Sequence, residues 1–330
     1  SILIDKLISK NYNVYSIDIN SPSNPKNFKF INIDITNYDK LSSFFNNNHI
    51  EYIFHNVAQV PLANSKKLFH DVNINGTENI CKLAKKYNIK HIVYTSSSAV
   101  YGVPKKNPVD ELTNPIPSED YGKAKLEGER ICEKFSSNQM KITIIRPRTI
   151  LGHGRLGIFS ILFDWIENNK KIPLLNNGSN LYQFVHAEDL ADACILSLNQ
   201  KKEREIFNIG SDDLFTMREI LEILVNEVNS KTKFYSLPLF PIENILNFLS
   251  FIRLIPLSKY HTLMYGRSLY FDITKAKKIL KFSPKYSTKE MFIESYKDYV
   301  VNKNNLNKIN LSHHQKKTPQ LLLRVIKFFS

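Results

Sequence analysis

Short apolar runs alternate with amphipathic stretches along the first half of the chain. The apolar runs fall at residues 13–19, 28–35, 52–58, 91–97 and 141–148. Stretches with the three-to-four-residue spacing of an amphipathic helix fall at residues 2–10, 38–47, 71–88 and 119–137. Runs that are apolar on both faces suit parallel strands covered by helices on either side. This order predicts an α/β fold with a doubly wound parallel sheet.

The rhythm changes after residue 149. Helical patterns follow at residues 158–168, 190–198, 216–229, 241–252, 273–280 and 288–302, with very short strands at 184–186 and 206–209. Residues 1–149 and 182–212 are therefore expected to form the sheet domain. Residues 150–181 and 213–302 are expected to form a smaller, mainly helical lobe, and residues 303–330 a tail.

Composition narrows the class of protein. Of the 330 residues, 42% are hydrophobic and 23% are charged, which is typical of a globular chain. No run of 18 apolar residues is present to predict a spanning helix. Cys81, Cys132 and Cys194 each lie among apolar neighbours without paired spacing. We therefore expect buried, reduced thiols and a cytoplasmic protein.

The net charge of +14 does not indicate a nucleic-acid partner, because it is unevenly spread. Residues 301–330 hold six basic residues and no acid, which leaves +8 on the other 300 residues. No basic groove with interleaved aromatic residues is visible, so nucleic-acid binding is not expected. The apolar, basic segment 318–330 and the apolar stretch 239–257 would suit a membrane surface. Packing within the lobe is the favoured interpretation of both.

The first element has the pattern of a helix. A dinucleotide-binding sheet normally begins with a strand and a glycine-rich turn that leads into such a helix. Asp18 ends the next predicted strand, where a carboxylate would bind ribose hydroxyls. We expect that the strand and turn precede Ser1 in a longer chain and that this fragment is less stable and binds cofactor poorly. The alternative is a chain that never had the turn.

Tyr121 and Lys125 are the strongest chemical signal. They are four residues apart on a predicted helix, so they share a face. A positive charge about 4 Å from the phenol contributes roughly 4 kcal/mol at an effective dielectric of about 20. That interaction lowers the pKa of the phenol by up to about 3, which makes it a usable base near neutral pH. Taken alone, the pair is also common on helix surfaces.

A run of hydroxyl residues, 95–98, ends the fourth apolar run. Hydroxyls at the carboxyl end of a parallel strand point into the ligand crevice. A serine run alone usually marks a turn, but here the Tyr121 and Lys125 pair follows on the next helix.

Together these motifs resemble the extended short-chain dehydrogenases/reductases, of the NAD-dependent nucleotide-sugar epimerase and dehydratase type, with a Rossmann-type sheet. The resemblance covers nearly all of residues 1–300. Further similar segments are His55-Asn56-Val57-Ala58-Gln59, Asn73-Ile74-Asn75-Gly76-Thr77-Glu78-Asn79, Arg146-Pro147, Phe184-Val185-His186-Ala187-Glu188-Asp189, Phe207-Asn208-Ile209-Gly210 and Asp272-Ile273-Thr274-Lys275-Ala276.

The resemblance implies a role for each matching residue. Ser97 is the catalytic hydroxyl, Tyr121 the base, and Lys125 the group that lowers its pKa and binds the nicotinamide ribose. The residues implied to contact NAD are Asp18, Asp34, Ile35, Val57, Ala58, Asn73, Tyr121, Lys125 and Pro147. The residues implied to contact substrate are Ser98, Tyr182, Gln183 and Arg267.

Several residues have a plainer interpretation. His55 and His186 each lie in a strand pattern and are interpreted as structural, and no cluster has the spacing of metal ligands, so no metal is expected. Gly152-His153-Gly154 is interpreted as a turn near the lobe rather than a phosphate loop. Asn73 would also suit a helix cap. Tyr182 occupies the position at which many nucleotide-sugar epimerases have arginine. Arg267 is therefore the group expected to contact a diphosphate.

The resulting hypothesis is an NAD-dependent epimerase of a nucleotide sugar, acting through a transient keto intermediate, and we expect a homodimer. One alternative is a dehydrogenase or ketoreductase of a non-sugar, sterol-like alcohol. Another is a non-catalytic NAD-binding scaffold. The related 4,6-dehydratases resemble one another in an acidic pair before the strand-end Tyr-Gly. Ser98 and Ala99 stand at those positions, so 4,6-dehydration is not expected.

Overall fold

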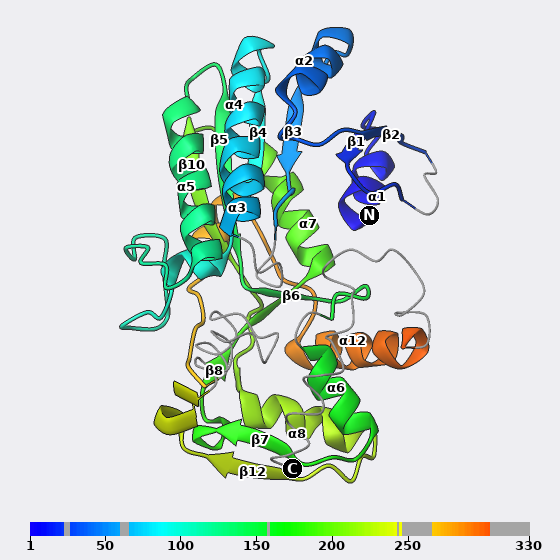
Figure 1. Cartoon of the computed structure of the whole chain (residues 1–330), viewed down its shortest axis with the longest axis vertical. Coiled ribbons are helices and arrows are strands. Elements are labelled where there is room, and N and C mark those ends of the chain that lie inside the picture. Colours follow the sequence, from blue (N-terminus) through cyan, green and yellow to red (C-terminus); the bar gives the residue numbers. More distant parts are fainter. Residues whose placement is uncertain (23–26, 60–65, 157–158, 243, 246–265, 304–330) are drawn as a thin grey trace.

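The predicted parallel sheet is present. The computed structural model describes residues 1–330 except 23–26, 60–65, 157–158, 243, 246–265 and 304–330. Four parallel strands lie in the order β10-β5-β4-β3. They are β3 (Tyr52–His55), β4 (His91–Thr95), β5 (Lys141–Pro147) and β10 (Arg204–Ile209). This arrangement confirms the α/β, doubly wound fold class (Figure 1).

The first two strands form a separate parallel pair. β1 (Tyr15–Asp18) and β2 (Lys29–Asn32) bond only to each other, in the register Tyr15 to Lys29. In the part of the chain that the structure describes, no ladder joins this pair to β3. The Tyr15 ring packs edge-on against Phe44 of α2 (Tyr38–Asn47), with ring centroids 5.4 Å apart.

Helices cover both faces of the four-stranded sheet, because alternate strand residues point to opposite sides. Ile92 and Tyr94 of β4 belong to a core shared with α2, α4 (Thr77–Lys86) and α5 (Asp120–Phe135). Val93 faces the other way, into a core shared with α7 (Ala187–Leu196) and α11 (Thr274–Leu280). Helix α1 (Ile2–Ser9) packs along α7 through contacts that include Lys6 with Asp192, 2.7 Å apart.

Several helix boundaries follow from side-chain caps. The Asn37 side chain accepts the Lys40 N–H at the start of α2. Ser287 and Glu290 form a capping box at the start of α12 (Thr288–Asn302). At the start of α5 the Glu119 carboxylate accepts the backbone N–H groups of Tyr121 (2.7 Å) and Gly122 (2.6 Å). This cap holds Tyr121 in the first turn of its helix.

The helix predicted over 71–88 is interrupted. The observed helical segment begins before the predicted bound and runs through α3 (Lys66–Leu68), a π-helical segment η1 (Phe69–Gly76) and α4, which ends at Lys86. The Thr77 hydroxyl donates to the Asn73 carbonyl oxygen at 2.8 Å and contacts His55 Nε2 at 2.9 Å. A side chain that inserts into the helical ladder in this way is a recognised cause of such irregularity.

A second group of helices and short strands lies below the sheet in Figure 1. These elements surround an aromatic core of their own. Phe163, Phe184 and Phe292 are fully buried there, on α6, β9 and α12. Its other elements are α6 (Phe159–Glu167), α8 (Met217–Glu227), and the strand pairs β7 (Ile172–Leu175) with β12 (Phe234–Leu237), β8 (Leu181–Tyr182) with β11 (Phe215–Thr216), and β6 (Thr149–Leu151) with β9 (Phe184–His186). Of these strands only β9 was predicted, as the short run 184–186. The others were missed, because strands of two to four residues leave too short an alternating pattern.

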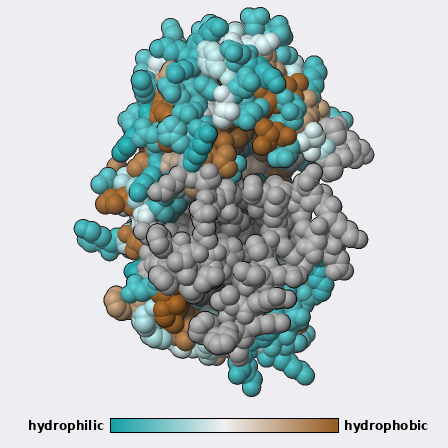
Figure 2. All heavy atoms as spheres, viewed as in Figure 1, coloured by the Kyte–Doolittle hydropathy of each residue, from teal (hydrophilic) through white to brown (hydrophobic). Residues whose placement is uncertain are grey.

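Some expectations fall outside the described residues. These are most of the helix predicted at 241–252 and the segment 318–330. Within the described chain, no helix is long and apolar enough to cross a membrane. The visible described surface is mainly hydrophilic, with hydrophobic residues scattered among polar ones (Figure 2). The three cysteines are buried and unpaired, as predicted.

Candidate active site

Ser97 lies at the carboxyl edge of the sheet, just after β4. The Ser96 backbone N–H donates to the Ile145 carbonyl oxygen at 2.7 Å, which extends the contact between β4 and β5 beyond the strand. Ser97 then caps the short 3₁₀ helix η2 (Ser98–Tyr101), and its hydroxyl oxygen accepts the Ala99 N–H at 3.1 Å. Its side chain is half-buried, at the edge where ligands bind in open α/β sheets.

Lys125 is buried against the end of the same strand. Its ammonium donates to the Thr95 carbonyl oxygen at 2.7 Å and lies 4.8 Å from the centre of the Tyr94 ring. The side chain is only 2% exposed. Burial lowers the pKa of Lys125 to about 8, because a charged amine is costly away from water.

Helix α5 brings Tyr121 to this edge because its first turn touches η2 directly. A side-chain carbon on Gly122 would lie 2.5 Å from the Ala99 carbonyl oxygen, so only glycine permits this approach. The Tyr121 ring is half-buried and packs edge-on against Phe69, with centroids 6.2 Å apart. The structure therefore brings Ser97, Tyr121 and Lys125 to one edge of the sheet.

A buried polar network fixes α5 against the sheet, and the sequence reasoning missed it. Glu129 binds Arg146 in two places, with Oε1–Nε 2.9 Å and Oε2–NH2 2.5 Å, and accepts the Ser96 hydroxyl at 2.5 Å. Arg146 also donates to the Tyr101 hydroxyl at 2.6 Å. Its pKa is raised, because these contacts with Glu129 and Tyr101 outweigh the cost of burial. The available signal was Glu129, one helical turn beyond Lys125 on the same face.

The residues implied to bind the adenosine half of NAD lie at the last residue of β1 and just after β2. Asp18 is exposed, and its carboxylate accepts the Asn20 N–H at 2.9 Å. Asp34 is also exposed, but its carboxylate holds the backbone N–H and hydroxyl of Thr36, both at 2.8 Å. The Ile35 side chain is 4% exposed and belongs to the core, so only its backbone can face a ligand.

Asn73 and Gln59 clamp the loop that follows β3. Asn73 accepts the Gln59 N–H at 2.7 Å and donates to the Gln59 carbonyl oxygen at 3.0 Å. Asn73 lies inside η1, and Gly76 is at the N-cap position of α4, so the alternative of a helix cap is wrong. Val57 and Ala58 are half-buried in this loop. The side-chain oxygen of Gln59 is buried and has no partner among the described residues, so this edge offers an unused polar atom that fits a bound cofactor.

Pro147 is the last residue of β5, and three of the predicted substrate residues, Tyr182, Gln183 and Arg267, lie outside the four-stranded sheet. Pro147 is buried and opposite Ile209 in the sheet. The Tyr182 hydroxyl lies 3.0 Å from that of Thr149. Both ends of the Gln183 amide are used inside the protein, by the Ser211 carbonyl oxygen and the Phe271 N–H. Arg267 is half-buried, and its carbonyl oxygen accepts from Asn180 at 3.4 Å.

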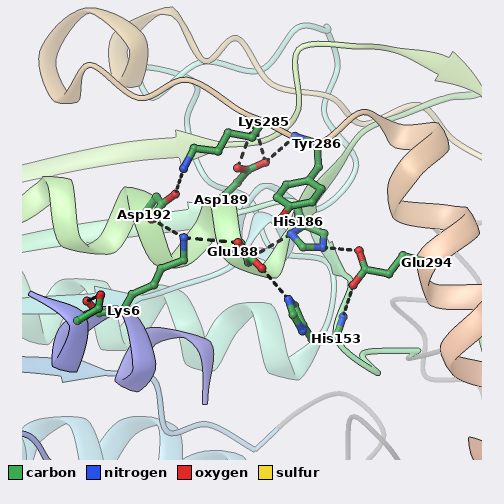
Figure 3. Close-up of polar contacts among 10 residues, drawn as sticks. Lys6, His153, His186, Glu188, Asp189, Asp192, Lys285, Tyr286 and Glu294 are labelled. Carbon is green, nitrogen blue, oxygen red and sulfur yellow. Dashed lines mark hydrogen bonds and ion pairs between the residues drawn. The ribbon is translucent and has the colours of Figure 1, made fainter.

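The two histidines interpreted as structural have internal partners. His55 is buried, and burial lowers its pKa to about 3, so it stays neutral. His186 Nδ1 accepts the Glu188 N–H at 3.2 Å, which caps α7, and Nε2 lies 3.0 Å from a Glu294 oxygen (Figure 3). Because Nδ1 accepts, the neutral ring carries its proton on Nε2 and donates it to Glu294.

His186 is also part of a group that could hold a metal ion. Donor atoms of His153, His186 and Glu294 all lie within 4.8 Å of one another, although sequence spacing gave no hint of this. A metal on His186 Nε2 would move the proton to Nδ1, which faces the Glu188 N–H. His153 Nε2 is itself 2.9 Å from Glu188 Oε1 (Figure 3). The arrangement fits a hydrogen-bonded junction better than a metal centre.

The Gly152-His153-Gly154 segment is a turn, as predicted. Its three residues have φ angles of 88°, 51° and 70°, in the left-handed region. Their successive N–H groups donate to Ser295 (3.1 Å), Glu294 (3.1 Å) and Asp298 (2.7 Å) of α12. The amides that a phosphate loop would offer are therefore taken by α12 itself.

Residues 1–210 match the family model described as the NAD dependent epimerase/dehydratase family. The chain belongs to this family. The chain is 43% identical over 330 residues to an uncharacterised protein of Sinorhizobium fredii, covering 99% of this chain and 82% of that protein. It is 33% identical over 243 residues to a putative UDP-glucose 4-epimerase of Methanocaldococcus jannaschii, covering 69% of this chain and 78% of that protein.

A solved structure of another protein shows the same fold. The crystal structure of the UDP-glucose 4-epimerase of Thermotoga maritima with UDP-glucose superposes with a TM-score of 0.74 at 23% identity. The match covers 91% of this chain and 94% of that one. The predicted resemblance is thereby confirmed, as are the assignment as an enzyme and NAD as its cofactor.

Proposed function

We propose that this protein is an NAD-dependent epimerase of a nucleotide sugar. The observation that carries the proposal is the buried Lys125 on the same face of α5 as Tyr121, at the strand end that also carries Ser97. Ala99 and Ser98 offer no carboxylic acid there, which supports reaction at one carbon rather than 4,6-dehydration.

Each catalytic residue has a proposed role. Tyr121 takes the proton of a sugar hydroxyl, holds it on its phenol oxygen, and returns it to the sugar oxygen when the keto carbon is reduced again. Ser97 donates a hydrogen bond to that sugar oxygen. The positive charge of Lys125 favours the ionised form of Tyr121 and binds the nicotinamide ribose. When bound, NAD accepts the hydride from the sugar carbon and returns it to the opposite face.

Positions along the sheet edge support the proposed cofactor contacts. Asp18 would bind the adenosine ribose, while Asp34 and the Ile35 backbone would flank the adenine. Val57 and Ala58 would lie beneath the cofactor, Asn73 would lie near the reacting centre, and Pro147 would line the nicotinamide site. Ser98, Tyr182 and Arg267 remain the proposed substrate contacts.

Net oxidation of a non-sugar alcohol is the second candidate. It is favoured by Tyr182, which stands where the resemblance leads one to expect a diphosphate-binding arginine, and by Gln183, whose amide is fully used inside the protein.

The test is to incubate the full-length protein with NAD and UDP-, GDP- and dTDP-hexoses, and to follow product mass and NADH absorbance. We expect a product of unchanged mass and no accumulation of NADH, with Tyr121→Phe as the inactive control. NADH that accumulates with a non-sugar, sterol-like alcohol, while no hexose is converted, would establish the second candidate. A product lighter by one water would contradict the absence of 4,6-dehydration.

A further inference from the structure

An unpaired cation lies beneath the candidate active site. Arg148 follows β5 directly, and its side chain is 1% exposed. It makes one side-chain hydrogen bond, from NH1 to the Ser98 hydroxyl oxygen at 2.8 Å. Its Nε and NH2 atoms are buried without a partner, and no carboxylate of the described residues forms an ion pair with it.

The surroundings of Arg148 do not neutralise its charge. The guanidinium lies over the Tyr182 ring, 4.8 Å from its centre, and 5.7 Å from that of Phe271. Aromatic faces attract a cation but leave its N–H groups unsatisfied. Arg146, two residues earlier, shows the contrast, because Glu129 binds it in two places. Arginine stays charged in proteins, so a bare positive charge persists here.

Such a charge is costly to fold around and acts strongly on nearby anions, because the protein interior screens it weakly. A buried polar group without a partner calls for an explanation, and a ligand that supplies the partner is one. Arg148 is placed for such a role by its bond to Ser98, the neighbour of Ser97. Because the Ser98 oxygen accepts from Arg148, the Ser98 hydroxyl proton is left to donate to an acceptor in the site.

We propose that Arg148, acting with Ser98, selects a substrate that carries a carboxylate close to its reacting carbon. This inference rests on the proposed function and names its substrate class as a nucleotide-linked sugar acid. The carboxylate is favoured over the diphosphate because Arg148 contacts the residue next to Ser97, which is at the reacting end of the substrate. Arg148 orients the Ser98 hydroxyl through their hydrogen bond, and its positive charge attracts the substrate anion.

Binding of a carboxylate to Arg148 requires a local rearrangement. Both unpartnered atoms are covered in this structure, so direct contact with a carboxylate needs a neighbouring side chain to move. Tyr182, whose ring lies on the guanidinium, is the side chain placed to do so. The positive charge favours the acid even without that movement.

The test compares UDP-glucuronate with UDP-glucose, using the full-length protein with NAD. For the wild type we expect kcat/KM to favour the acid by at least about tenfold. Arg148→Met keeps the length of the side chain and removes the charge. It should lower that preference by at least about tenfold, mainly through KM for the acid, and leave UDP-glucose within a few fold. Arg148→Lys should keep most of the preference.

A stability measurement separates selection from a purely structural role. Replacing an unpaired buried charge with an apolar side chain should leave the thermal midpoint of Arg148→Met unchanged or raise it. UDP-glucuronate should also raise the midpoint of the wild type more than UDP-glucose does, and this difference should disappear in the variant. If Arg148→Met does not fold, Arg148→Lys and Ser98→Ala are compared instead. Ser98→Ala should lower the ratio of kcat/KM for UDP-glucuronate and UDP-glucose several-fold.

Three results would overturn the inference. The first is a wild type whose kcat/KM favours UDP-glucose over UDP-glucuronate. The second is an equal loss of kcat/KM for both substrates in Arg148→Met, which a contact with the diphosphate would produce. The third is an unchanged preference for UDP-glucuronate in Arg148→Met. If the wild type converts UDP-glucose but not UDP-glucuronate, the proposed epimerase function holds and only the proposal of a carboxylate-bearing substrate is wrong. If the wild type converts no nucleotide sugar, the proposed function itself is contradicted.

Discussion

Glu129 and Arg146 form a two-contact ion pair in the interior, with side chains 5% and 3% exposed. Glu129 lies one turn after Lys125 on α5, and Arg146 lies near the end of β5. The pair therefore ties the helix that carries Tyr121 and Lys125 to the sheet, and through the Ser96 hydroxyl it ties that helix to the strand end beside Ser97.

Removing one partner of this pair should be strongly destabilising. Glu129→Ala leaves the Arg146 guanidinium buried without its carboxylate, and we expect the free energy of unfolding to fall by about 3–5 kcal/mol. Urea unfolding followed by circular dichroism measures it. The matched control is Glu127→Ala on the same helix, which breaks an exposed pair with Arg130 and should cost less than about 1 kcal/mol. Equal effects of the two substitutions would show that the buried pair has no special role.

Tyr121→Phe should remove turnover. The variant keeps the ring and its packing against Phe69 but lacks the hydroxyl that is proposed to take the proton. Loss of a general base typically costs about a hundredfold or more in rate. Steady-state kinetics should show this loss, while the dissociation constant for NAD stays within a few fold. Activity above about a tenth of wild type would rule out Tyr121 as the base.

The pH dependence of kcat/KM should report Lys125. Burial lowers its pKa to about 8, so the charged form is present below that pH and is lost above it. Since the charge is proposed to favour ionised Tyr121, kcat/KM should fall as the pH rises through about 8. Lys125→Arg keeps a charge that does not titrate in this range, so its lower activity should lack this alkaline decline. A wild-type profile that stays flat to about pH 9.5 would count against the assignment.

Asp18 should set the choice between NAD and NADP. Its exposed carboxylate ends β1, where it would repel a 2′-phosphate and bind the ribose hydroxyls. We expect the full-length protein to prefer NAD, and Asp18→Ala to narrow the ratio of kcat/KM for the two cofactors. Asp39→Ala, an exposed carboxylate on α2, is the control and should leave the ratio unchanged. Equal use of both cofactors by the wild type would contradict this role.

Local patterns along the sequence were sufficient for much of the fold. Helices at 38–47 and 288–302 have the predicted bounds, because apolar spacing and capping residues act within a few neighbours. The alternation of strands and helices predicted the parallel sheet for the same reason. The position of Tyr121 and Lys125 on one face of α5 needed only the geometry of one helix.

Contacts between distant residues were decided by the tertiary structure alone. Glu129 meets Ser96 and Arg146, and His186 meets His153 and Glu294, across separations that no periodic pattern records. The bare charge of Arg148 is of the same kind, since it depends on which side chains packing leaves beside the guanidinium. The residue types and helical faces of the candidate site were thus set by sequence, whereas burial and the pairing of its charges arose only when strands β4 and β5 met helix α5.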